Sequence, residues 1–217
     1  MWRIKILCNN NFYDKDYFEN GRETKKSWYE NYRWMPQRSF REALAFIDVL
    51  CLNKDSYVLD VGCSKGFLVK AFRELEVKAD GADISDYALS FAPYRCWNCS
   101  NENSWEEHKD WGYTHIIAKD MLEHLNKEEL EKELSNFAKI CNKIMCVVPM
   151  GELGRYRIPE YELDQSHIIR ENESWWYNTF EMNGWKVIFH TNHVKGIKDN
   201  WIHYPDGNHV FVLERLV

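Results

Sequence analysis

The feature that most constrains the fold is the stretch Tyr57–Val69, which reads YVLDVGCSKGFLV. It begins with an apolar, β-branched run typical of a strand, is interrupted by Gly62 and Gly66, and continues with apolar residues at helical spacing. Glycine has no Cβ, so these two positions allow a left-handed turn and the close approach of a ligand to the backbone. The stretch therefore predicts a strand, a tight turn and a helix whose first N–H groups point at a ligand.

A second strand is predicted over Val77–Asp83, and it ends in a carboxylate. Asp83 follows the glycine turn by about twenty residues, the spacing at which an acidic side chain can accept both hydroxyls of a ribose. The two strands together indicate an α/β sheet that binds a nucleoside at its carboxyl edge.

Three motifs in order, Leu59–Gly66, Gly81–Ser85 and Asp120–Leu125, resemble those of the class I S-adenosylmethionine-dependent methyltransferases. The resemblance covers roughly residues 44–217. It implies a doubly wound, seven-stranded Rossmann-like α/β sheet with strand order 3-2-1-4-5-7-6, in which strand 7 is antiparallel. The chain departs from the family at Ser64, where a glycine is usual, and at Lys65, where a small residue is more common.

The resemblance also implies which residues hold S-adenosylmethionine. The loop after the third strand, with Asn101 and Glu102, is where the family contacts the adenine amine. Cofactor binding is expected from Asp60, Gly62, Cys63, Ser64, Gly66, Phe67, Asp83, Ile84, Ser85, Asn101 and Lys119.

The chain divides into an aromatic N-terminal cap, residues 1–45, and a methyltransferase domain, residues 46–217. Within the cap, Trp28, Tyr29, Tyr32 and Trp34 crowd a short polar segment. These rings either fix the cap to the body or line a pocket above the cofactor. A helix is expected from Gln37 to near Cys51, because its apolar residues recur at the spacing of one helix face.

The remaining elements follow from hydrophobic periodicity. The segment 151–172 has little periodicity and is too long for a routine connection, which indicates a substrate loop. Strands are expected over 94–99, 113–118, 143–149, 185–190 and 209–216, and helices over 86–92, 127–141 and 173–183.

Methyl transfer to a hydroxyl requires a base, and histidine has a suitable pKa. His167 is the first candidate because it lies in the segment 151–172, with Asp164 as an orienting carboxylate. His124 is the second, since it follows the fourth strand close to Asp120, where similar enzymes border the transferred methyl group. For both histidines a purely structural role, tying down backbone or packing inside, stays open.

A metal-assisted version joins these residues. Asp120, Glu123, His124 and His167 resemble the divalent-metal ligands of small-RNA 2′-hydroxyl and ubiquinone-pathway methyltransferases. Oxygen-rich ligands with one or two imidazoles suit Mg²⁺ or Mn²⁺. A similar Leu-Glu-His-Leu sequence also occurs in relatives that use no metal, so both versions stay open.

Composition narrows the partners and the location. The formal net charge of −6 disfavours binding to nucleic acid, which requires clustered Lys and Arg. No apolar run reaches the roughly eighteen residues of a membrane span, and the N-terminus lacks a signal-peptide core, so we expect a cytoplasmic protein. The seven cysteines are scattered, which indicates reduced thiols. Cys96 and Cys99 have zinc-site spacing but no second ligand pair, so a metal is not expected there.

We therefore expect a methyltransferase acting on a small-molecule or glycan acceptor. Aromatic faces suit sugar rings, and the cap resembles those of methyltransferases associated with surface polysaccharides. The first hypothesis is O-methylation of a sugar, glycan or nucleotide-sugar. A phenolic or quinone-like acceptor is the alternative, and a cofactor-binding module without turnover is a third.

Overall fold

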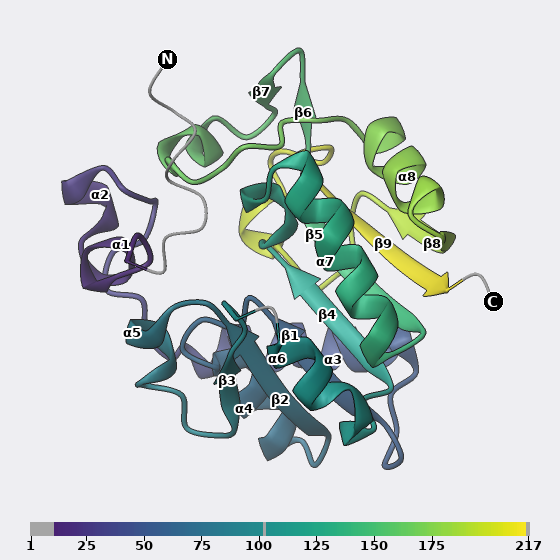
Figure 1. Ribbon diagram of the computed structural model, residues 1–217. Helices are drawn as coiled ribbons and strands as arrows, with labels where there is room; N and C mark the ends of the chain where they lie inside the picture. Colours follow the sequence, from purple (N-terminus) through teal and green to yellow (C-terminus); the bar gives the residue numbers. More distant parts are fainter. Residues whose placement is uncertain (1–10, 102, 216–217) are drawn as a thin grey trace.

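A single seven-stranded sheet organises the protein in the computed structural model, which describes residues 11–101 and 103–215 (Figure 1). Its strand order is β3-β2-β1-β4-β5-β9-β8. The first five strands are parallel, whereas β9 is antiparallel to both of its neighbours, so the predicted order is confirmed. The strands are β1 (Tyr57–Val61), β2 (Lys78–Asp83), β3 (Cys96–Asn98), β4 (His115–Lys119), β5 (Lys143–Pro149), β8 (Trp185–Thr191) and β9 (Asn208–Arg215).

Helices cover both faces of this sheet (Figure 1). One core contains buried residues of α3 and α4, and the other contains those of α7 and α8. The central parallel strands β1, β4 and β5 are thus buried on both sides, which explains why β1 and β5 are almost wholly apolar. The helices are α1 (Lys15–Glu19), α2 (Gly21–Thr24), α3 (Pro36–Leu50), α4 (Phe67–Glu74), α5 (Asp86–Leu89), α6 (Ser104–His108), α7 (Lys127–Ile140) and α8 (Glu173–Met182).

Two regions differ from the elements expected from the sequence. The third strand, Cys96–Asn98, is shorter than the predicted 94–99, and Arg95 just before it pairs with Asp80 through its side chain. The segment 151–172 has structure of its own: the hairpin β6 (Gly151–Glu152) and β7 (Arg155–Tyr156), followed by a 3-10 turn at Pro159–Leu163. These elements place His167 and its neighbours above the carboxyl edge of the sheet.

A buried carboxylate stabilises the amino-terminal half of the sheet. Asp80 of β2 is fully buried and accepts hydrogen bonds from Arg73 (2.8 Å), Arg95 (2.8 Å), Tyr57 (2.5 Å) and Tyr113 (2.9 Å). Burial alone would raise its pKa, but these hydrogen bonds outweigh it and hold the pKa below the usual value. The network joins β1, β2 and the segments before β3 and β4.

The N-terminal cap forms a small aromatic core of its own. Tyr17 and Phe18 of α1 are buried against Tyr29, Tyr32 and Tyr87. Of the expected cap, residues 1–10 lie outside the described part. The expected division at residue 45 falls inside α3.

An ion pair fastens this cap to the glycine turn. Lys65, only 6% exposed, pairs with Glu19 of α1 and donates to the carbonyl of Tyr32 at 2.8 Å. Lys65, one of the two residues that depart from the family pattern, therefore helps to hold the cap. No helix in the described ranges is long and apolar enough to cross a membrane.

Candidate active site

The turn between β1 and α4 is left-handed at three positions. Gly62, Ser64 and Gly66 have φ values of 78°, 53° and 69°. A Cβ at Gly62 would lie 2.8 Å from the Cβ of Met121, so that position requires glycine sterically as well. Ser64 takes up the strained conformation that a glycine usually adopts here, and the turn keeps its tight form.

Asp83 fixes the position of this turn. Its carboxylate accepts the backbone N–H of Ser64 at 2.7 Å and that of Ser85 at 2.8 Å. Burial raises the pKa of Asp83, while these two backbone hydrogen bonds oppose the rise. One carboxylate thus joins the ends of β1 and β2, where the resemblance implies the ribose.

A cavity of about 430 Å³ opens above the turn. Its wall includes Tyr17, Trp28, Tyr29 and Tyr32 of the cap. The three tyrosines therefore line a pocket as well as packing together, whereas Trp28 packs against Trp201. Of the residues singled out from the sequence, it contains Asp60, Gly62, Cys63, Ser64, Phe67, Lys119, Asp120, Glu123, His124 and His167.

The cavity fits S-adenosylmethionine. Among the described residues, Ser64 Oγ is buried without a hydrogen-bond partner at the cavity wall. Gly62 and Ser64, both in the left-handed turn, line the cavity. A nucleoside with polar hydroxyls and a charged amino-acid end suits such a wall of backbone, carboxylates and aromatic rings.

Some expected cofactor residues have other roles. Asn101 is exposed and accepts the N–H of Asn103 at 3.0 Å. Ser85 caps α5, accepting from Ala88 N–H at 3.0 Å, and donates to the carbonyl of Tyr13 at 2.5 Å. The carbonyl of Ile84 faces the side-chain amide of Asn98 at 3.3 Å, and Glu102 lies outside the described residues.

His124 belongs to a chain of hydrogen bonds that ends on a carboxylate. Ser166 Oγ donates to Asp164 at 2.5 Å and lies 2.8 Å from Nδ1 of His124. The single hydroxyl proton is committed to Asp164, so Nδ1 of His124 donates to Ser166 and Nε2 carries the lone pair. Tyr17 of the cap donates to the same carboxylate at 2.7 Å. Asp164 was expected to orient His167. Its hydrogen bond to Ser166 instead connects it to His124.

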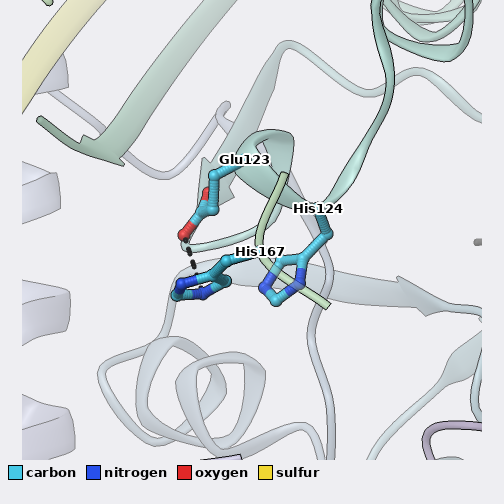
Figure 2. Close-up of side chains that lie close together, drawn as sticks. All are labelled: Glu123, His124 and His167. Atoms are coloured by element: carbon cyan, nitrogen blue, oxygen red, sulfur yellow. Dashed lines mark ion pairs between the residues drawn. The ribbon is translucent and has the colours of Figure 1, made fainter. Parts of the chain in front are cut away.

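His167 is oriented by a backbone carbonyl instead, and its ring faces the carboxylate of Glu123 (Figure 2). Its Nδ1 lies 2.9 Å from the carbonyl of Tyr161, to which it donates, and its Nε2 faces Glu123 Oε1 at 3.9 Å. Burial, together with the neighbouring His124, lowers the pKa of His167 to about 3. The ring is thus neutral at pH 7, with its lone pair directed at Glu123.

Glu123 completes a group of three possible ligands. It is 1% exposed, and its Oε2 has no hydrogen-bond partner within the described ranges. Burial, and then the charge of Asp120, raise its pKa well above the usual value. One ligand atom from each of Glu123, His124 and His167 lies within 4.8 Å of the others. This arrangement would accommodate either a proton on Glu123 or a divalent cation.

Asp120 makes different contacts from those expected of a metal ligand. In a left-handed backbone conformation (φ 55°), it pairs with Lys198 at 2.5 Å and Lys119 at 3.0 Å. The two ammonium groups outweigh the effect of burial and hold the pKa of Asp120 well below its ordinary value. Lys198, Ser166 and Tyr17 were missed in the sequence, because nothing in their local spacing marks them as neighbours of this edge.

Most of the chain is similar to a known protein family. A family model described as a methyltransferase domain matches residues 32–193. None of the curated protein sequences matches the chain.

Solved structures share the fold. A SAM-dependent methyltransferase from Archaeoglobus fulgidus is similar with TM-score 0.62 and 15% identity, over 81% of this chain and 94% of that one. A magnesium protoporphyrin IX methyltransferase from Synechocystis, with bound SAH, is similar with TM-score 0.60 and 14% identity, over 95% of this chain and 100% of that one. A mitomycin 7-O-methyltransferase is similar with TM-score 0.57 and 12% identity, over 83% of this chain and 53% of that one.

Proposed function

The chain belongs to the methyltransferase-domain family, and from this premise we propose that it methylates a hydroxyl of a sugar, glycan or nucleotide-sugar with a histidine as base. Its cofactor is S-adenosylmethionine. One observation carries the proposal: His124 and His167 line the same cavity as the turn at Gly62 and Ser64.

When bound, S-adenosylmethionine supplies an electrophilic methyl group. The residues of this chain then have to hold the acceptor in line with that group and remove its proton. His124 suits proton removal, because its Nδ1–H is held by Ser166 and its Nε2 lone pair is left for the acceptor. The ring of His167 lies beside it, with ring centroids 4.6 Å apart, and its own lone pair is directed at Glu123.

The cavity wall supports a hydroxyl-rich ring as acceptor. Flat faces come from Trp28, Tyr29 and Trp201, on which a sugar ring can stack. Charged groups, among them Asp120 and Lys198, lie in the same wall and can hydrogen-bond to several hydroxyls. A wall that mixes rings with charges favours a polar cyclic acceptor over a purely apolar one.

The group formed by Glu123, His124 and His167 favours a second candidate, metal-assisted methylation of a phenolic or quinone-like acceptor. A divalent cation between these ligands would satisfy the unpartnered oxygen of Glu123 and lower the pKa of a bound hydroxyl. The similar mitomycin 7-O-methyltransferase is, by its name, an O-methyltransferase of mitomycin.

Methyl-labelled S-adenosylmethionine, offered with panels of nucleotide-sugars, free sugars and catechols, tests the proposal. Label should appear in a sugar hydroxyl, and activity should survive removal of divalent cations by a chelator. Chelator-sensitive transfer to a catechol would favour the second candidate. Cofactor binding without transfer to any hydroxyl would contradict both and support a binding module.

A further inference from the structure

A second cluster of ligand-type side chains lies away from the cavity, at the sheet edge formed by β8 and β9. It consists of Glu173 at the start of α8, His190 of β8 and His209 of β9. We propose that these three residues form a structural site for a transition-metal ion such as Zn²⁺. This inference goes beyond the proposed function and does not depend on it.

The spacing of the three donor atoms supports the site. His190 Nδ1 lies 3.0 Å from Glu173 Oε1 and 3.2 Å from His209 Nε2, and His209 Nε2 lies 3.8 Å from Glu173 Oε1. Nitrogen and oxygen ligands about 2.0–2.2 Å from a tetrahedral zinc ion are separated by about 3.4 Å. The triangle therefore has the dimensions of one face of a zinc tetrahedron.

Protons alone satisfy this triangle poorly. A neutral imidazole donates through only one nitrogen, so the contact between His190 and His209 uses a single proton. If that proton is on His190 Nδ1, two acceptors, His209 Nε2 and Glu173 Oε1, face each other at 3.8 Å. If it is on His209 Nε2, the two facing acceptors are His190 Nδ1 and Glu173 Oε1, at 3.0 Å. His209 is 5% exposed, so little water reaches this triangle from its side. A cation would accept the lone pairs of all three ligand atoms at once.

Access and ligand chemistry also suit a metal. The side chains of Glu173 and His190 are 45% and 43% exposed, so an ion can reach the site and keep water in the fourth position. Two imidazoles and one carboxylate are ligands for Zn²⁺ and neighbouring transition metals, and poor ligands for Mg²⁺. A bound ion would join the first residue of α8 to two strands, immediately after the loop that carries His167.

The test is titration of the full chain, first freed of metal by a chelator, with Zn²⁺ in a calorimeter. Wild-type protein should bind Zn²⁺, and His190→Ala should remove one bound ion or weaken its affinity at least about tenfold. Glu173→Gln should do the same. In parallel, Co²⁺ should give the visible absorption of a four-coordinate site in wild type, and both variants should lose it.

Two matched variants distinguish this site from other histidines. His193→Ala removes an exposed imidazole near the cluster, and His167→Gln removes one from the cavity. Both should retain the ion bound by His190. Zn²⁺ should also raise the melting temperature of wild type more than that of His190→Ala. Unchanged stoichiometry and affinity in both His190→Ala and Glu173→Gln would overturn the proposal, as would absence of binding by wild type.

Discussion

The hydroxyl of Ser166 lies 2.8 Å from Nδ1 of His124, although 42 residues separate them along the chain. This contact joins the loop after β5 to the turn after β4, directly over the cavity. Because Ser166 also donates to Asp164, the imidazole is held in one tautomer. The loop therefore orients a histidine that it does not itself contain.

Replacing the histidine bases separates chemistry from cofactor binding. His124→Gln and His167→Gln should each be tested for turnover and for SAH affinity, because loss of a general base costs about 10²–10⁴-fold in rate. Whichever histidine is the base, its variant should lose turnover by that factor, while its affinity for SAH, measured by calorimetry, stays unchanged. His203→Gln, at an exposed position, is the control. Normal rates in both cavity variants would exclude a histidine base.

Asp83→Asn tests the ribose assignment. The carboxylate accepts two backbone N–H groups, and its charge-assisted hydrogen bonds are expected to extend to a nucleoside. SAH affinity should fall by about 1–3 kcal/mol, measured by calorimetry. Asp110→Asn, at an exposed position, should leave affinity unchanged. Equal binding by both variants would show that Asp83 does not hold the cofactor.

The buried His167 should make stability depend on pH. Its pKa is lowered from 6.5 to about 3, so between these values the unfolded chain binds more protons than the folded one. The free energy of unfolding should therefore rise with pH across this window, by up to about 1.4 kcal/mol per unit from this group.

Urea titrations of wild type and His167→Gln at several pH values measure this contribution. Other buried histidines, such as His115 with a pKa of about 4, contribute to both proteins and cancel in the comparison. The slope should be smaller in the variant between pH 3 and 6.5. Parallel curves would mean that His167 is not held neutral by burial.

The pair formed by Lys65 and Glu19 should couple cap and turn energetically. Lys65→Met leaves the carboxylate of Glu19 without its ammonium partner, and Glu19→Gln leaves the ammonium of Lys65 without its carboxylate. A double-mutant cycle by urea unfolding should give an interaction energy of about 0.5–3 kcal/mol. The exposed pair of Arg22 and Glu30 is the comparison and should couple more weakly. Strictly additive effects at Lys65 and Glu19 would contradict the fastening role.

The sheet could be predicted because its information is local. Apolar runs mark β1 and β5, and the glycines mark the turn. The strand order was implied by the family resemblance that three motifs carry, and the structure confirms it. The short hairpin β6–β7 was missed because two-residue strands carry almost no periodic signal.

The hydrogen-bond network of the site could not be predicted in the same way. Tyr17 reaches Asp164 across 147 positions, and Lys198 reaches Asp120 from a loop with no distinguishing pattern. Such contacts follow from how the cap and loops pack, which spacing along a sequence does not encode. His124 and His167 were identified because the reaction requires a base near that edge, whereas Ser166 follows only from the packing.

The network around Asp80 lies at the amino-terminal half of the sheet, and the cavity lies at the other end. A fully buried carboxylate with four donors tolerates little change, because losing one donor leaves charge without compensation. Mutational damage there should reduce how many molecules fold, while each molecule that does fold retains its catalytic rate. The yield of folded protein and the specific activity should thus depend on opposite ends of one sheet, so substitutions in the loops that line the cavity should leave the folding of the sheet unchanged.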